Sequence, residues 1–353
     1  MRYLGMDVHV KSTVWCLLDA GGEVVEKGKG STTAAELTSL VQRLAKDEPL
    51  VAAQECGKLS HFVHDVLSPL DVKLLTFNPY HLRVIAASRK KTDKRDGYWL
   101  AKTVQSGMMP HPVYIPTGIV RQLRALLNER DTVTGQRKAW LVRASTLLQA
   151  AGLDARQHSG KGWIEKPLQQ PDGIDEQLKL ALERCERMAL ALTGELTVID
   201  ARLHQHATSI EQVQRLQTIP AIGEKVALTI YALVGDISRF HTARQLCAYA
   251  GLTPSVRQSA DSSVTGRITK EGSKQLRRAL TQAGHVLLFR CQSESSAPLK
   301  AKPARIAVHR ARRKIAVVAA ARHILRTAFY VLRDQTDYNP ALLRSPAATT
   351  QAA

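Results

Sequence analysis

The sequence has few aromatic residues and few acids for its length. Phe, Trp and Tyr make up 5% of the 353 residues, and 31 Asp and Glu stand against 50 Lys and Arg, a formal net charge of +19. Such an imbalance is typical of a protein whose partner carries many negative charges, most often nucleic acid. A merely soluble basic protein or a membrane-surface binder would show the same excess, so charge alone leaves these classes open.

The sequence also lacks paired cysteines. Its five cysteines are far apart and form no CxxC or Cys/His cluster, so neither a zinc finger nor a disulfide framework is indicated. The amino terminus has no signal-peptide pattern, and no apolar run approaches the length that spans a membrane. We therefore expect a cytoplasmic protein with reduced thiols and no membrane partner.

Strand and helix patterns alternate in the first part of the chain. They predict, in order, strands at 2–10, 13–20 and 23–30, a helix at 31–48, a strand at 50–55, a helix at 58–70, a strand at 71–77 and helical stretches within about 79–105. Three antiparallel strands followed by alternating helices and strands are the order of an α/β RNase H-like fold. The sequence therefore predicts such a domain at the amino terminus.

Two aspartates interrupt a basic cluster in the segment KKTDKRD, residues 90–96. If the chain is helical there, Asp93 and Asp96 share one face, at i and i+3. Asp7 on the first predicted strand and Glu55 at the end of the fourth would join them, because these strands are neighbours and the last helix packs across their ends. Four carboxylates suit one or two Mg²⁺ ions, which clamp the attacking and leaving oxygens of a phosphodiester.

Basic residues surround the two aspartates, and they would hold a nucleic-acid backbone beside the metal. These are Lys90, Lys91, Lys94 and Arg95. The alternative is that Asp93 and Asp96 only form ion pairs with Lys90 or Arg95 on a solvated helix face. The position of Asp7 among apolar strand residues favours the metal site. His9 is interpreted as a structural or exposed residue, with a supporting role beside the metal ligands as the alternative.

The rest of the chain is mainly helical. The patterns predict helices at about 116–153 and 175–207 with a linker at 158–173 between them, mostly helical structure with two loops at 213–290, a connector at 290–304 and a last helix at about 305–333. Within this part, residues 216–240 resemble a helix-hairpin-helix, whose turn amides hold a phosphate without reading bases. Ala221 stands where that motif usually has glycine, and a plain structural helical hairpin is an equal alternative.

A serine-rich loop is predicted after Pro254, with serines at 255, 259, 262 and 263. It is followed by the basic residues Arg267, Lys270, Lys274, Arg277 and Arg278. Serine becomes a useful nucleophile only when a base or a metal takes its proton. No base lies nearby in the sequence, so the metal site of the first domain would have to do this. By itself the stretch is typical of an ordinary loop.

The stretch 299–333 carries ten Lys and Arg and no acid. Its second part is apolar enough for a core helix, whereas its first part is a basic face suited to contacts with a nucleic-acid backbone. The residues of that face are Arg310, Arg312, Arg313 and Lys314. The alternative is that these cations are ordinary solvent-exposed residues, but the complete absence of acids in the stretch argues against it.

Several motifs occur in an order that resembles the insertion-sequence 110 (IS110) transposases and the related Piv-type DNA invertases. They are GMDVH, QECG, KTDKRD, IPAIGEKVA and GLTP…GRITKEGSKQLR. The resemblance implies a RuvC-like DEDD metal-binding domain at 1–112, a helical linker or coiled-coil region at 113–207, a mostly α-helical transposase domain at 208–340 and a disordered tail at 341–353. Asp7, Glu55, Asp93 and Asp96 match its metal site.

The resemblance also implies a catalytic serine that joins DNA covalently. Ser259 matches it by position, after Gly-Leu-Thr-Pro and before Gly-Arg-Ile. The family usually has Ser-Gly there and this chain has Ser259-Ala260, so Ser262 and Ser263 stay open as alternatives. Further implied partners are donor and target DNA, a structured non-coding guide RNA, and other copies of the chain in a dimer or tetramer. In such an oligomer the serine of one subunit meets the metal site of another.

Together, the residues and the resemblance lead to the hypothesis of a Mg²⁺-dependent, RNA-guided serine recombinase that moves an insertion sequence. One rival is a structure-selective nuclease of the RuvC type, which uses the same carboxylates with water as the nucleophile. A second is a protein-guided site-specific DNA invertase that needs no RNA. A third is a non-catalytic nucleic-acid-binding protein, against which the four acids argue.

Overall fold

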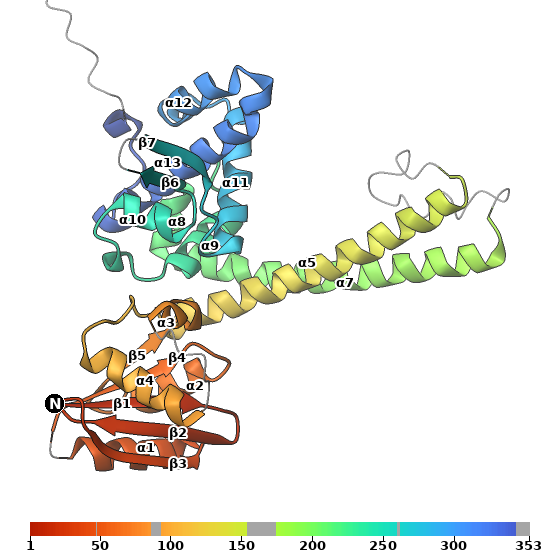
Figure 1. Cartoon of the computed structure of the whole chain (residues 1–353). Helices are drawn as coiled ribbons and strands as arrows, with labels where there is room; N and C mark the ends of the chain where they lie inside the picture. The colour runs from red at the N-terminus through yellow and green to blue at the C-terminus, as the bar shows by residue number, and fades with distance from the viewer. Residues whose placement is uncertain (47, 86–92, 154–173, 260–261, 344–353) are drawn as a thin grey trace, which may run out of the picture. The chain divides into compact units, whose positions relative to one another are not determined.

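The computed structural model describes residues 1–46, 48–85, 93–153, 174–259 and 262–343 (Figure 1). The chain divides into two compact units, Met1–Pro116 and Thr117–Ala353. The predicted linker at 158–173 and most of the predicted tail at 341–353 lie outside the described residues. The finer division into 1–112, 113–207 and 208–340 stays a prediction.

The first unit is built on a five-stranded mixed sheet with the strand order β3-β2-β1-β4-β5. Its strands are β1 (Arg2–Val8), β2 (Ser12–Leu18), β3 (Val24–Ser31), β4 (Leu50–Glu55) and β5 (Val72–Phe77). β1, β2 and β3 pair antiparallel, and β4 pairs parallel with both β1 and β5. The five predicted strands and their expected order are confirmed, and β1 lies at the centre of the sheet.

Helices cover both faces of this sheet. They are α1 (Ala34–Ala45), α2 (Ser60–Leu67), α3 (Pro79–Ile85) and α4 (Asp93–Gln105). α1 begins where the Thr33 hydroxyl accepts a hydrogen bond from the Glu36 amide, which satisfies one of the free amides of the first turn. α1 and α2 bury an apolar stripe against Leu4 and Met6 of β1, while Leu100 and Val104 of α4 join a separate core cluster.

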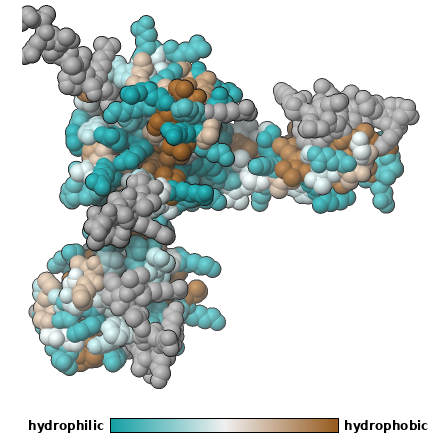
Figure 2. All heavy atoms as spheres, turned by 45° about the horizontal axis from the view of Figure 1, so that its top comes forward, coloured by the Kyte–Doolittle hydropathy of each residue, from teal (hydrophilic) through white to brown (hydrophobic). Residues whose placement is uncertain are grey.

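The second unit begins with two long helices that lie side by side, α5 (Gly118–Ala150) and α7 (Glu176–Ser209). Their far ends share a small apolar cluster that includes Ala144, Leu148 and Leu182. Figure 2 shows apolar atoms gathered at that end of the pair. The near ends of both helices contribute to the large core of the unit.

Besides short 3-10 helices, the described part of the second unit contains further α-helices, a hairpin and the long helix α13. They are α8 (Glu211–Gln217), α9 (Glu224–Val234), α10 (Ala243–Tyr249), β6 (Pro254–Ser259), β7 (Ser262–Ile268), α11 (Lys274–Phe289), α12 (Ala297–Ala307) and α13 (Arg313–Asp334). α13 packs against α8, α10, α11 and α12. Burying its apolar side chains supplies much of the hydrophobic stabilisation of this unit.

Asp200 of α7 ties the long helices to α9. Its carboxylate accepts hydrogen bonds from Arg130 of α5 at 2.6 Å and from Lys225 of α9 at 2.7 Å. Burial by itself would raise the pKa of Asp200, but the bonds from Arg130 and Lys225 outweigh it and hold the pKa below the ordinary value. Three helices are thus joined by one ionised carboxylate.

Three expectations from the sequence were wrong. The predicted connector at 290–304 contains most of α12, which accommodates Pro298 in its first turn, where the amide has no helical partner, and buries Pro303. The predicted serine-rich loop is a β-hairpin. Among the described residues, α13 is long and apolar enough to cross a membrane, contrary to expectation, but 61% of its apolar window is buried in the fold, as in a core helix.

Candidate functional site

Asp7 and Glu55 lie next to each other at the carboxyl ends of the neighbouring strands β1 and β4. β1 and β4 are parallel and pair as far as Met6 and Gln54, so Asp7 and Glu55 are the next residues along. The Asp7 side chain is 18% exposed, whereas Glu55 is an exposed residue. Parallel register therefore brings two of the four predicted acids to the same end of the sheet, where β1 and β4 finish.

A glycine contact fixes α4 on the face of β1 that carries Asp7. A Cβ atom at Gly5 would lie 1.9 Å from the carbonyl oxygen of Gly97 and 2.5 Å from the amide nitrogen of Ala101. Only a residue without a side chain lets the helix backbone approach so closely. Since side chains alternate along a strand, the face of β1 that meets α4 at Gly5 is also the face of Asp7, two residues on.

The direction of α4 places its first turn near Asp7. At the other end of the helix, Gln105 donates a hydrogen bond of 3.0 Å to the carbonyl oxygen of Ala20, next to the strand end that pairs with the start of β1. The amino end of α4 consequently points toward the end of β1. Asp93 and Asp96 occupy that end, four residues and one residue before Gly97. Asp7 and Glu55 thus lie at neighbouring strand ends, and the first turn of α4 points toward the end of β1. That all four acids form one site stays a prediction.

The described side chains do not by themselves complete a metal site. Among them, no three His, Cys, Asp or Glu side chains are grouped so that they could hold a metal ion. Asp96 is partly buried, and the side chain of Asp93 lies outside what the structure describes. The donor chemistry nevertheless fits, because carboxylate oxygens are the ligands that Mg²⁺ prefers.

His9, for which the sequence left a structural and a supporting role open, lies beside Asp7. Its Nε2 atom lies 3.1 Å from a carboxylate oxygen of Asp7, and its side chain is 53% exposed. The spacing of two residues on an extended chain was a usable signal, since such residues share a face. The two side chains are within hydrogen-bonding distance of each other.

Ser259 ends the strand β6, at the tip of the hairpin. It is the register partner of Ser262, and Ser263 pairs with Gln258. The three candidate serines therefore lie within two residues of the same turn, whose residues 260–261 lie outside the described structure. The register brings Ser259 and Ser262 to one place without distinguishing their roles.

The base of the hairpin is held by two glycines. Gly251 and Gly272 have φ angles of 65° and 95°, a region that side chains disfavour. A Cβ atom at Gly251 would lie 2.1 Å from the carbonyl oxygen of Glu271, and one at Gly272 would lie 1.9 Å from that of Tyr249. The Thr269 amide also donates to the Thr253 carbonyl at 2.9 Å. These contacts explain the glycines of the GLTP and KEGSK motifs.

The predicted nucleic-acid-binding cations fall into three groups. Arg277 donates to the Ala250 carbonyl at the end of α10, and Arg278 forms an ion pair with Asp131, so both have partners within the fold. Lys90, Lys91 and the side chains of Lys94, Arg95 and Arg310 lie outside the described structure. The exposed members are Arg267, Lys270, Lys274, Arg312, Arg313 and Lys314.

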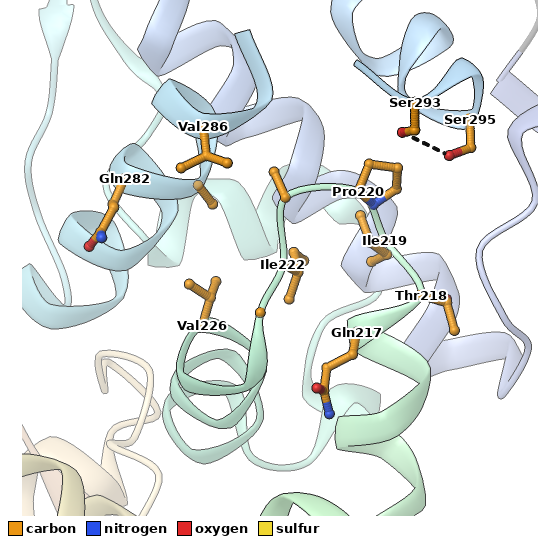
Figure 3. A pocket seen from close by; sticks show the side chains of 13 residues that line it. Gln217, Thr218, Ile219, Pro220, Ile222, Val226, Gln282, Val286, Ser293 and Ser295 are labelled. Carbon is orange, nitrogen blue, oxygen red and sulfur yellow. Dashed lines mark hydrogen bonds between the residues drawn. The ribbon is translucent and has the colours of Figure 1, made fainter. Parts of the chain in front are cut away.

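The helical hairpin predicted within 216–240 is formed by α8 and α9. Its turn borders an open pocket of 470 Å³, across from Gln282 and Val286 of α11 (Figure 3). Ala221 has a φ angle of 69°, which explains why glycine usually stands at this place in such a motif. The hairpin is confirmed as structure, while its contact with a phosphate stays a prediction.

Comparison with known proteins gives matches along both units. The DEDD transposase model of IS110 matches residues 4–152, and the model of the IS116/IS110/IS902 transposase family matches residues 213–300. The chain belongs to the IS110 family of transposases. An IS110-family transposase is an enzyme that cuts and rejoins DNA, and its DEDD domain has an RNase H-like fold, with which the sheet of the first unit agrees.

Individual relatives support the same family. The chain is 28% identical to the transposase of IS1111A from Coxiella burnetii, over 82% of this chain and 78% of the relative. It is 27% identical to the IS1328 transposase of Yersinia enterocolitica, over 72% and 76% of the two chains. A pilin gene-inverting protein of Moraxella bovis is 28% identical over 62% of this chain and 60% of its own length.

Proposed function

We propose that this transposase is an RNA-guided serine recombinase that moves an insertion sequence. The observation that carries the proposal is the packing of α4 on β1, next to β4, because these three elements bear the acids that the family pattern requires. The pilin gene-inverting relatives favour recombination over simple cleavage, since an inversion both cuts and rejoins DNA.

In this proposal Asp7, Glu55, Asp93 and Asp96 hold one or two Mg²⁺ ions. When bound, such ions supply positive charge at the scissile phosphate and favour ionisation of a hydroxyl there. The carboxylates of the chain fix the position of that charge, and His9 orients the Asp7 carboxylate. The exposed cations near the hairpin and at the start of α13 hold the DNA or RNA backbone.

Ser259 is the proposed nucleophile. Its Oγ atom forms a bond to phosphorus, the bond from phosphorus to one deoxyribose oxygen breaks, and the serine proton ends on the released hydroxyl. One phosphate ester replaces another, so a second DNA hydroxyl can reverse the step and join a new strand. The proposal requires Ser259 and the four carboxylates to act on the same phosphodiester, within one subunit or between subunits of a dimer or tetramer.

A structured guide RNA is the proposed source of sequence selection. The +19 charge suits two nucleic-acid partners, and the sequence contains no recognisable base-reading module. Base pairing with the RNA would then choose donor and target DNA, while the protein holds backbone and shape.

The test is a strand-exchange assay with protein that is co-expressed with the non-coding flanks of its element. Wild-type protein should exchange strands in Mg²⁺ and lose activity after ribonuclease treatment, in EDTA, and in the Ser259→Ala variant. Exchange that survives ribonuclease would indicate a protein-guided invertase. Cleavage that survives Ser259→Ala would indicate a nuclease that uses water. Binding without either reaction in all samples would favour the non-catalytic alternative.

A further inference from the structure

An exposed aromatic ring stands at the end of α11, where this helix crosses α13. The crossing is close, because a Cβ atom at Gly284 would lie 2.6 Å from the carbonyl oxygen of Val317. Phe289 is the last residue of α11, five residues beyond Gly284, and is 45% exposed. Single exposed apolar side chains are ordinary on protein surfaces, so the groups beside this ring decide whether it has a partner.

The groups beside Phe289 are those that bind nucleotide bases. The His285 ring lies 4.9 Å from the Phe289 ring, between centroids, and is tilted by 56°. The Arg313 guanidinium of α13 lies 6.0 Å from the Phe289 ring centroid. His285 and Arg313 are both exposed. Aromatic rings and guanidinium planes are the surfaces on which unpaired bases stack.

The charge around the ring suits a polyanion. Arg290 follows Phe289, Arg312 and Lys314 flank Arg313 in the chain, and all three are exposed. Residues 299–333, which include Arg313, contain no acid. Such a one-sided surface attracts phosphates from solution.

Tyr330 provides an internal comparison on α13, the helix that carries Arg313. It is 41% exposed, and the Arg333 guanidinium lies 4.9 Å from its ring centroid. Arg333, however, forms an ion pair of 2.6 Å with Asp334. The cation beside the Tyr330 ring is therefore paired with an acid, whereas residues 272–293, which include Phe289, contain no acid.

We propose that Phe289, His285 and Arg313 form a stacking site for an unpaired nucleotide base, with the neighbouring cations on its phosphates. The inference deepens the proposed function and rests on it for the presence of a nucleic-acid partner. Bases of a duplex stack on one another, so the site selects single-stranded segments of RNA or DNA over duplex. Unpaired RNA and unpaired DNA share this chemistry.

The test is equilibrium binding of the full-length protein in EDTA, where strand exchange does not occur. Fluorescence anisotropy would follow labelled oligonucleotides of one length: single-stranded RNA, single-stranded DNA, abasic single-stranded DNA and blunt duplex. Phe289→Leu should weaken binding to RNA or DNA single strands by about fivefold or more. Its affinity for the abasic strand and the duplex should stay unchanged. Whichever of single-stranded RNA and single-stranded DNA is bound more weakly by the variant, relative to wild type, is the preferred ligand.

Two controls separate stacking from other causes. Phe289→Tyr should keep most of the affinity because it keeps the ring, and Tyr330→Leu should leave binding unchanged. Equal loss on the abasic strand, or no loss on any strand, would overturn the proposal. So would a changed oligomeric state of Phe289→Leu in light scattering, which would make the ring a contact between subunits. Because the assay needs neither metal nor Ser259, loss of strand exchange alone does not affect its result.

Discussion

The strand ends of the first unit that carry Asp7 and Glu55 differ from the serine hairpin of the second unit in how far apart their parts lie in the sequence. The strand ends are brought together by elements far apart in the sequence, since β1 pairs with β4 in parallel and packs against α4 through a glycine contact. The hairpin consists of two adjacent strands and depends on its base, because an isolated two-stranded hairpin is marginally stable in water. The proposed metal site, which must hold several ligands in place, is therefore supported by elements packed in the core of the first unit. The proposed nucleophile, Ser259, lies at the turn end of a two-stranded hairpin.

The largest expected effect tests the strand ends of the first unit. Gly5→Ala should destabilise the protein by about 3 kcal/mol or more, because its Cβ atom would overlap the backbone of α4. Gly97→Ala is the matched control: its Cβ atom would lie 3.2 Å from the Gly5 carbonyl oxygen, so a small shift relieves it. Chemical unfolding followed by fluorescence would compare them. Equal stability of the two variants would contradict the close contact between α4 and β1.

The next effect tests the base of the hairpin. Gly272→Ala should cost about 2 kcal/mol, because alanine disfavours a φ angle of 95° and its Cβ atom would meet the Tyr249 carbonyl. Gly272 is exposed, so the chain around it can relax more than the buried backbone at Gly5. Limited proteolysis should show faster cutting near residues 254–268, with the first unit unchanged. Uniform protection would show that the hairpin does not depend on this glycine.

The smallest effect is a gain in stability. Ala221→Gly should stabilise the second unit by about 0.5 kcal/mol, since the strain of alanine at a φ angle of 69° exceeds the entropy that glycine loses on folding. Differential scanning calorimetry would detect a small rise in the unfolding temperature. A fall would show that contacts of the Ala221 methyl group in the hairpin outweigh the strain.

The sequence predicted the first unit far better than the second. The β-prone runs that form β1, β2 and β4 are local signals, and the strand order then brings Asp7 near Glu55. The contact between Gly5 and Gly97 has no local signal, because it depends on two elements meeting in space.

In the second unit, local signals misled. Serines favour loops, yet the pairing of residues 254–259 with 262–268 makes strands. The sequence predicted a connector at 290–304, yet α12 accepts Pro298 in its first turn and has Pro303 as a buried residue. Tertiary packing decided both cases, and single-chain patterns do not record it.

The central claim is that Ser259 and the four carboxylates act on one phosphodiester, and covalent trapping tests it most directly. Wild type, Ser259→Ala and Asp7→Asn, each co-expressed with the non-coding flanks of the element, would be incubated with labelled DNA and Mg²⁺ and separated on denaturing gels. We predict a labelled protein–DNA adduct in wild type alone, with the DNA mapped to Ser259 by mass spectrometry. Cleaved DNA without an adduct, or an adduct that persists in Ser259→Ala, would contradict the account.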